Sequence, residues 1–326
     1  MNKMKKIGLS ALAGSLVAFS AANAEVTVSG GASVGVSSGN ETRPSAYYMA
    51  DSINFTYSGE TDSGLTVTQK LELEGAAGDT YSTSIAGGFG TLTYHGHGGS
   101  SVMSGWDDMT PSAYEEVWAY ASYDSATSVT TGVNEVVMIN GRAGNKLWRY
   151  DSPTMSGVSV HAAYVQAAAA AGEADHGDVN SYSDFGIQIA PEMVEGLSIG
   201  YAFGEIDESA TITNDESTLW VKYTNGPISV GYQTSEVDGS TTTQDDEATL
   251  MSISYAVSDD MSISYGTAEV NLGSSTTDQE SKGFSASYTM GGVSISLAMN
   301  ETDNIAGQTG TAFDVEGYDL NVAFAF

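Results

Sequence analysis

The last nine residues of the chain, Tyr318 to Phe326, alternate strictly between two kinds of side chain. The large apolar set consists of Tyr318, Leu320, Val322, Phe324 and Phe326. The residues between them are small or polar, which is typical of a strand with one apolar face. Soluble domains usually end in loose, polar segments, whereas a closed sheet in a bilayer pairs its last strand with its first and leaves no free edge in lipid. The ending therefore predicts a membrane-spanning β-barrel.

A basic, then apolar, then small-residue sequence opens the chain. Three lysines precede an apolar run from Ile7 to Phe19, and Ala22-Asn23-Ala24 follows that run. This order predicts a secretory signal peptide over residues 1–24 and a mature chain that starts at Glu25. The run is shorter than a transmembrane helix requires, and an N-terminal anchor helix is the alternative interpretation.

The chain is strongly acidic, with 41 Asp and Glu against 10 Lys and Arg, a net charge of −31. Three basic residues and no acidic ones precede Glu25, so the expected mature charge is 7 − 41 = −34. Such a chain repels nucleic acid and attracts cations, and a pore lined by these groups favours cations. Because the chain has no cysteine, disulfides, thiolate nucleophiles and cysteine metal sites are excluded.

Sixteen segments with period-2 alternation can be read between Val26 and the C-terminus. Short turns alternate with longer loops rich in Asp, Thr and Gly, and both mature ends lie on the short-turn side, as in bacterial outer-membrane barrels. Strands of roughly ten residues tilted near 40° climb about 25 Å, the height of the apolar band of such barrels. No linker divides the chain, so we predict that residues 25–326 form one antiparallel transmembrane β-barrel of about 16 strands.

Tyrosine placement supports the same fold. Five tyrosines on the predicted outward faces each precede a short turn by one to a few residues: Tyr57, Tyr150, Tyr223, Tyr255 and Tyr288. Round a barrel they would form a ring at one lipid–water boundary, where a phenol buries its ring and keeps its hydroxyl in water. Tyrosines in the core of a soluble sandwich have no reason to gather at one end of every second strand.

The connection over about 96–145 is far longer than an ordinary loop. A barrel of about sixteen strands encloses a wide aqueous lumen, so we expect this loop to fold inward and narrow it. The acidic residues expected at the constriction are Asp107, Asp108, Glu115 and Glu116. Two alternatives stay open: the loop is a surface flap, or the alternation from Val117 to Tyr123 adds a strand pair and raises the count to eighteen.

Basic residues on the wall are few. Alternation places Lys70, Arg149 and Lys222 on lumen-facing positions, and Arg142 lies where the long loop returns. We expect Lys70, Arg149 and Arg142 to face the loop acids and set a transverse field in the constriction. The alternative is that these side chains only keep the lumen solvated.

Short motifs complete a family resemblance. Gly88-Phe89-Gly90-Thr91-Leu92 enters the long loop, Arg149-Tyr150-Asp151-Ser152-Pro153 closes it, and the chain ends at Phe326. In this order, with the signal peptide and the sixteen-strand rhythm, they resemble a general diffusion porin of the Gram-negative (proteobacterial) outer membrane. The resemblance implies a homotrimer, a third loop folded into the pore with Arg149 at its eyelet, and recognition of the terminal strand by the barrel-assembly machinery. Many relatives carry several wall arginines where this chain has Ser52 and Asn54, which favours cations.

We therefore expect a water-filled outer-membrane channel, embedded in outer-membrane lipid, for passive diffusion of small hydrophilic solutes and cations, with no catalysis, cofactor or metal. A substrate-specific sugar channel and a barrel adhesin are alternatives on the same fold. The only aromatic residues for a sugar track are Trp220 and the loop residues Trp106 and Trp118. His95 and His97 have the spacing of a metal pair, but no third ligand is nearby, and we interpret them as solvated polar residues.

Repeats and motifs of other classes are missing from the sequence. Gly-Gly-x-Gly-x-Asp nonapeptides, which mark a calcium-dependent β-solenoid, do not recur, and no phosphate-cradling Gly loop stands out. Loop acids have no ligand spacing that defines a divalent-cation site.

Overall fold

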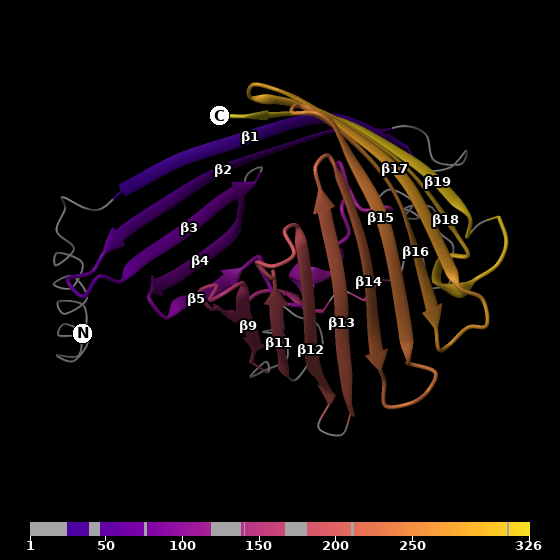
Figure 1. Ribbon diagram of the computed structural model, residues 1–326, viewed down its shortest axis with the longest axis horizontal. Helices are drawn as coiled ribbons and strands as arrows, with labels where there is room; N and C mark the ends of the chain where they lie inside the picture. Colours follow the sequence, from indigo (N-terminus) through magenta and orange to yellow (C-terminus); the bar gives the residue numbers. More distant parts are fainter. Residues whose placement is uncertain are drawn as a thin grey trace.

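A single closed sheet organises the molecule (Figure 1). The computed structural model describes residues 25–38, 46–74, 77–118, 138–139, 141–166, 181–209, 212–311 and 313–326. Within these residues, sixteen strands form an antiparallel barrel in which each strand pairs with its neighbour in sequence order. The predicted fold class and the count of sixteen strands are confirmed, and the eighteen-strand alternative is wrong. Residues 119–123 of the alternating segment that suggested it lie outside the described ranges.

The barrel strands differ in length, so the wall is uneven in height. The N-terminal wall consists of β1 (Glu25–Ser38), β2 (Ala46–Glu60), β3 (Thr66–Glu74), β4 (Ala77–Gly87), β5 (Gly90–His97), β8 (Leu147–Asp151) and β9 (Val158–Val165). The C-terminal wall consists of β11 (Ser181–Ile189), β12 (Leu197–Ser209), β13 (Ile212–Asn225), β14 (Ile228–Asp238), β15 (Asp246–Ser258), β16 (Met261–Leu272), β17 (Gln279–Met290), β18 (Val293–Asp303) and β19 (Val315–Ala325).

Short elements of regular structure lie in two of the loops. The long loop between β5 and β8 contains the paired strands β6 (Gly99–Ser100) and β7 (Ala143–Gly144) and the 3₁₀ turn η1 (Ser104–Trp106). The 3₁₀ turn η2 (Ile305–Gly307) follows β18. No helix in the described part of the chain is long and apolar enough to cross a membrane. The predicted signal peptide, residues 1–24, lies outside the described residues.

The ring closes between the first and the last strand. β1 pairs with β19 from Gly31 opposite Ala325 to Ser38 opposite Tyr318. Beyond this ladder, the Gly30 N–H donates to the Phe326 carbonyl oxygen at 2.8 Å, and the Phe326 N–H donates to the Gly30 carbonyl oxygen at 3.0 Å. The terminal residue is therefore part of the closure, as the alternating ending predicts. Figure 1 shows the C-terminus beside β1.

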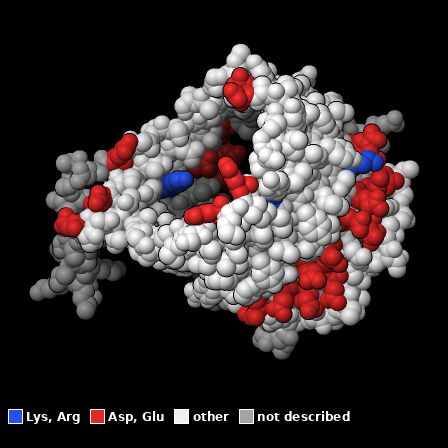
Figure 2. All heavy atoms as spheres, viewed as in Figure 1, with Lys and Arg blue, Asp and Glu red and all other residues white. Residues whose placement is uncertain are grey.

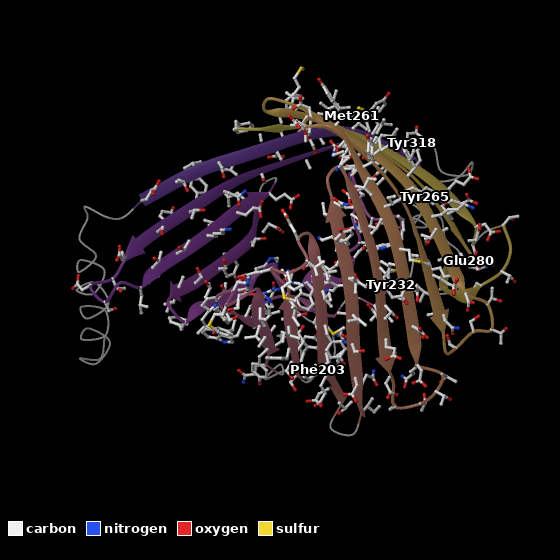
Figure 3. All side chains as sticks on the ribbon, in the orientation of Figure 1. Phe203, Tyr232, Met261, Tyr265, Glu280 and Tyr318 are labelled. Carbon is white, nitrogen blue, oxygen red and sulfur yellow. The ribbon has the colours of Figure 1, made fainter. Side chains whose placement is uncertain are left out.

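Alternation puts large apolar side chains on the outer face. Figure 3 shows Phe203, Tyr232, Tyr265 and Tyr318 on β12, β14, β16 and β19, and all four are exposed outside the barrel. Of the five tyrosines predicted to form a ring, Tyr57, Tyr223, Tyr255 and Tyr288 are exposed. Tyr150 is half-buried, and its hydroxyl donates to the carbonyl oxygen of Phe89 at 2.6 Å. Such a belt fits a lipid environment.

Position on the outer or inner face predicts tolerance to charge. Ile253 on β15 points outward in the middle of this belt and is 47 % exposed, whereas Ser254 points into the barrel. We expect Ile253→Arg to lower the free energy of unfolding by about 2–4 kcal/mol, because the guanidinium meets lipid. Ser254→Arg is the matched control and should change it by less than about 1 kcal/mol. Urea unfolding in lipid vesicles, followed by tryptophan fluorescence, measures the free energy of unfolding of both variants. Equal losses of stability in the two would contradict the assignment of Ile253 to the outer face and Ser254 to the inner face.

Candidate functional site

The long loop runs inside the barrel, along the inner wall from β11 to β19. It is held by side chains of successive strands that bond its backbone. The Met103 N–H donates to Asp184 Oδ2 at 2.8 Å, the Ser252 hydroxyl donates to the Pro111 carbonyl oxygen at 2.7 Å, and Asn300 Nδ2 donates to the Glu116 carbonyl oxygen at 2.9 Å. These contacts confirm that the loop folds inward, and the surface-flap alternative is wrong for residues 98–118.

Gln233 on β14 is the most extensive of these anchors. Its side chain is fully buried. Its Nε2 donates to the carbonyl oxygens of Trp106 at 2.6 Å and Asp107 at 3.1 Å, and its Oε1 accepts from the Met109 N–H at 2.7 Å. One amide therefore fixes both sides of the Asp107-Asp108 segment, because it satisfies backbone groups that the loop cannot pair within itself.

The tip of the loop docks where the barrel closes. The Tyr114 hydroxyl donates to Asp319 Oδ1 on β19 at 3.0 Å and accepts from Asn321 Nδ2 at 3.0 Å. The Tyr48 hydroxyl on β2 donates to the same Asp319 oxygen at 3.0 Å. Tyr48 reaches β19 across Gly35 of β1, where a Cβ would overlap the phenol ring. The docking site of the tip therefore combines the first two strands and the last.

Close approach of the loop backbone to the wall depends on inward-facing glycines. A Cβ at Gly231 would lie 2.9 Å from the Cα of Thr110, and a Cβ at Gly283 would lie 2.9 Å from the Cα of Val117. Both distances are shorter than real Cβ contacts, so any larger residue would push the loop into the lumen.

Two apolar clusters also fix the loop to the wall, and the sequence reading missed both. The first contains Val102, Met103 and Trp106 of the loop with wall residues Leu147, Ala163, Val165, Tyr182, Ala202, Ile206 and Trp220. The second contains Val117 and Ile139 with wall residues Ala248, Leu250, Ala268, Val270 and Leu272. These wall residues point inward, where a water-filled barrel is expected to be polar. Their burial shows that the loop covers this part of the wall.

Three loop acids lie near one another. Thr110 donates to Asp108 Oδ1 from its N–H at 2.8 Å and from its hydroxyl at 2.6 Å. Burial raises the pKa of the Asp108 carboxyl to about 6; the Thr110 bonds oppose this, and the carboxylates of Glu116 and Asp107 add to it. Burial also raises the pKa of Asp107, and the Glu116 charge raises it further. Glu115, the fourth predicted acid, directly precedes Glu116 in the loop and is partly buried.

The predicted basic residues lie elsewhere on the wall. Lys70 on β3 and Arg149 on β8 line one recess together. In the ring of sixteen strands, β3 and β14 are eight places apart in either direction, so Lys70 and the Gln233 anchor of the acidic segment are on opposite walls. Figure 2 shows a hollow in the molecule with acidic side chains at its border and a basic patch beside it. The tertiary structure thus separates the predicted acids from Lys70 by the lumen.

Arg149 and Arg142 contact the base of the loop. Arg149 Nη1 donates to the carbonyl oxygens of Ser100 at 3.1 Å and Ser101 at 2.8 Å, and its Nε donates to Asp151 Oδ1 at 3.1 Å. The Arg142 carbonyl oxygen accepts from the Ser101 N–H at 3.0 Å. Both arginines therefore help to join the start of the loop to its return.

A hydrogen-bonded relay adjoins Arg149, and the sequence reading did not identify it. His161 Nδ1 lies 2.7 Å from Asp151 Oδ1, and His161 Nε2 lies 3.0 Å from the Ser159 hydroxyl oxygen. The connectivity is that of a hydrolytic triad. Ser159, however, pairs with Gln188 in the β9–β11 ladder. Backbone N–H groups near Ser159 are therefore used in strand pairing and are not free to form an oxyanion hole. We interpret the relay as orienting the Asp151 carboxylate toward Arg149.

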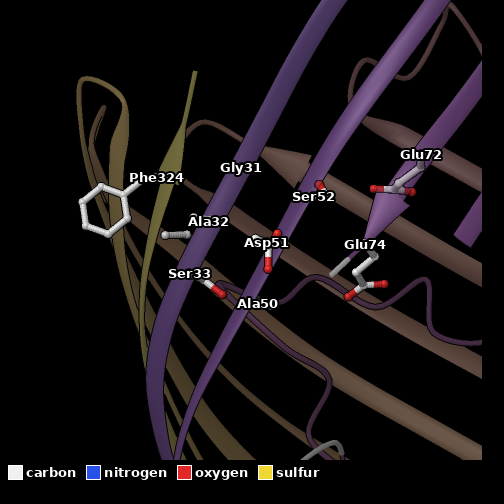
Figure 4. A pocket seen from close by; sticks show the side chains of 10 residues that line it. Gly31, Ala32, Ser33, Ala50, Asp51, Ser52, Glu72, Glu74 and Phe324 are labelled. Carbon is white, nitrogen blue, oxygen red and sulfur yellow. The ribbon is translucent and has the colours of Figure 1, made fainter. Parts of the chain in front are cut away.

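The opposite end of β3 forms an acidic recess of about 300 Å³. Figure 4 shows Glu72 and Glu74 of β3 beside Asp51 and Ser52 of β2. Asn54 Nδ2 donates to Glu72 Oε1 at 3.2 Å. No Lys or Arg lines this recess among the described residues.

The tryptophans do not line an open track. Trp106 and Trp220 pack edge to face with ring centroids 5.5 Å apart, and both are buried. Trp118 packs against the second apolar cluster. The aromatic candidates for sugar recognition therefore serve to dock the loop, which removes the sequence-based support for a sugar-specific channel.

A closed barrel with an apolar outer belt, and with an internal loop that narrows a polar lumen, has the architecture of a transmembrane diffusion channel. The model of the Gram-negative porin family matches residues 8–306. The chain belongs to this family and is an outer-membrane channel protein. No curated protein shows significant similarity to the sequence.

Solved structures share the fold. A porin refined at 1.8 Å resolution has a TM-score of 0.66 at 16 % identity, and the anion-selective porin from Comamonas acidovorans has 0.65 at 15 %. A loop-deletion variant of the outer-membrane protein OmpT of Vibrio cholerae has 0.68 at 11 %. In each case the similarity covers 93 % of this chain and 100 % of the other.

The Gln233 anchor generates a prediction about the loop. We expect Gln233→Leu to weaken loop docking by about 1–3 kcal/mol, because it leaves buried backbone groups unpaired. The open channel should then fluctuate between current levels, measured as excess noise in planar bilayers. Thr234→Leu, on the outward face of the same strand, is the control and should leave the noise unchanged. Quiet single-level currents from Gln233→Leu would show that the other contacts suffice.

Proposed function

We propose that the channel is a cation-preferring general diffusion pore for small hydrophilic solutes. Its constriction lies between the loop acids Asp107, Asp108, Glu115 and Glu116 on one side and the wall bearing Lys70 and Arg149, with Arg142 at the loop base, on the other. The observation that carries the proposal is the fixed position of the acidic segment on Gln233, opposite β3. Rigid charges on facing walls create a transverse field, through which solutes pass by passive diffusion without energy input.

Charge, rather than fold, supports the preference for cations. The Comamonas acidovorans porin has the same fold and is anion-selective, so the barrel alone does not set the sign. Here the loop acids are supplemented by Glu72 and Glu74 on β3. The expected mature chain has seven basic residues, and Lys282 among them is paired with Glu301 at 3.0 Å. An excess of fixed negative charge concentrates cations in the lumen.

We infer the route to the membrane from the two ends of the chain. Residues 1–24 direct export and are removed before Glu25, which N-terminal sequencing of the purified protein tests. The terminal strand, whose last residue bonds Gly30, is recognised by the barrel-assembly machinery. A homotrimer is the assembly that the family resemblance implies.

A planar-bilayer recording tests the proposed pore. Under a gradient of KCl, we expect large ohmic steps, a reversal potential that favours potassium, and three equal closing steps from a trimer. Asp107→Asn with Asp108→Asn should lower the cation-to-anion permeability ratio about twofold or more, because two fixed charges leave the constriction. Asp259→Asn with Asp260→Asn, in the short turn after β15, is the matched control. No conductance from a folded, inserted barrel would exclude the proposed pore. Unchanged selectivity in the loop variant would show that Asp107 and Asp108 do not determine the cation preference.

The raised pKa of Asp108 predicts a pH dependence near pH 6. Above this value the Asp108 carboxyl is ionised and contributes to cation preference, and below it the group takes a proton and the contribution is lost. The permeability ratio should therefore fall as the pH is lowered from 7.5 to 5. Asp108→Asn should show the low-pH ratio throughout and a weaker pH dependence, with Asp107 accounting for the remainder. A wild-type ratio that is constant over this range would contradict the assignment.

A further inference from the structure

A recess of about 420 Å³ opens in the wall formed by β3, β4, β5 and β8, beside the base of the loop. Two rows of paired residues cross these strands. In the first row Lys70 pairs with Ser82, which pairs with His95. The second row runs Thr68, Ser84, Thr93 and Arg149. Directly paired side chains on one face of a sheet lie about 5 Å apart, so the two rows form one continuous polar surface.

The cationic groups of this recess differ in what they already bind. Arg149 uses its Nε on Asp151 and its Nη1 on two loop carbonyl oxygens. Lys70 is exposed to the lumen and makes no hydrogen bond or ion pair within the described part of the chain. The Nδ1 atom of His95 is buried and also has no hydrogen-bond partner there. The recess thus offers one unpaired ammonium group, whereas the buried Nδ1 of His95 is not accessible to a solute.

Hydroxyl groups supply most of the remaining lining, which also includes Asp151, the carboxylate that accepts from Arg149. Ser82, Ser84 and Thr93 line the recess, and within the described residues their hydroxyls bond no other group. Thr80 also lines it, but its hydroxyl donates to Asp79 at 3.2 Å. No aromatic residue other than His95 lines the recess in the described part of the chain, so it has no platform for a sugar ring. Free hydroxyl donors round a lysine fit an anion with several oxygens.

We propose that this recess is a binding subsite for a small tetrahedral oxyanion of the phosphate class. Lys70 is the charged contact, and the hydroxyls of Ser82, Ser84 and Thr93 donate to the remaining oxygens. A carboxylate is the weaker match, because the arginine fork that would hold it in two parallel bonds is occupied by Asp151 and the loop carbonyls. The pore as a whole is negatively charged, whereas this subsite is positively charged. Such a subsite would retain phosphate-bearing solutes during their passage.

The inference rests on the proposed pore only in that the solute reaches the recess from the lumen. Binding is therefore measured without conduction, from the line width of the ³¹P signal of inorganic phosphate added to the detergent-folded protein. At ~10 mM salt, where screening is weak, we expect saturable broadening. Lys70→Gln should raise the dissociation constant about tenfold, the effect of one charge-assisted contact. The double variant Ser82→Ala with Thr93→Val keeps the charges of Lys70 and Arg149 and should raise the dissociation constant by a smaller factor.

Lys222→Gln is the matched control, because Lys222 is also a lumen-facing lysine but lies on β13, outside the recess. It should leave phosphate binding unchanged. Sulfate should displace phosphate, and acetate at the same concentration should not. Absence of saturable broadening in the wild type, an equal effect of Lys222→Gln, or equal displacement by acetate would each overturn the proposal. A channel that conducts with cation preference but fails these tests keeps the proposed function and loses only the subsite.

Discussion

The hydrogen-bonded closure of β1 on β19 is the constraint on which the rest of the structure depends. In lipid, an unpaired strand edge leaves backbone groups without partners, so the sheet must form a ring. Once sixteen strands form that ring, β3 and β14 are opposite one another. The lumen and the walls that face across it are therefore consequences of backbone pairing. The tip of the loop depends on the same closure, because Tyr114 docks on Asp319 of the last strand, which also binds Tyr48 of the second.

The loop converts a wide barrel into a narrow channel by covering one half of its inner wall. Polar anchors such as Gln233 satisfy the loop backbone, glycines allow close approach, and two apolar clusters exclude water behind it. These contacts hold the acidic segment against its anchoring strands. Selectivity in the proposed mechanism therefore depends on where the loop is attached as much as on which charges it carries. The wall from β3 to β5, across the lumen from β14, keeps the lysine and hydroxyl groups that face the solute.

Much of the fold follows from alternation in the sequence. The loop-docking clusters were missed because the apolar residues move from the outer to the inner face partway along some strands. Along β16, Met261, Ile263 and Tyr265 point outward, but farther on the buried residues are Ala268, Val270 and Leu272, which point inward. The shift marks the point where the outer face leaves the apolar belt and the inner face becomes covered by the loop. Alternation correctly predicted that Lys70 and Arg149 line the lumen. It did not identify Gln233 or Asp319, because an inward-facing polar residue looks the same whether it meets water or a loop.

The sequence by itself determined that the chain forms a closed barrel of about sixteen strands and which faces meet lipid and lumen, and the structure decided sixteen over eighteen. These properties depend on period-2 patterns and on the cost of unpaired backbone in lipid, and both act locally along each strand. The tertiary structure alone decided the path of the loop, the burial of its tryptophans and the separation of Lys70 from the acidic segment. Those features depend on contacts between residues far apart in the chain, such as Met109 and Gln233, which are 124 positions apart. Only a closed barrel brings such residues together, since the surface on which the loop docks is built from strands far from the loop in the chain.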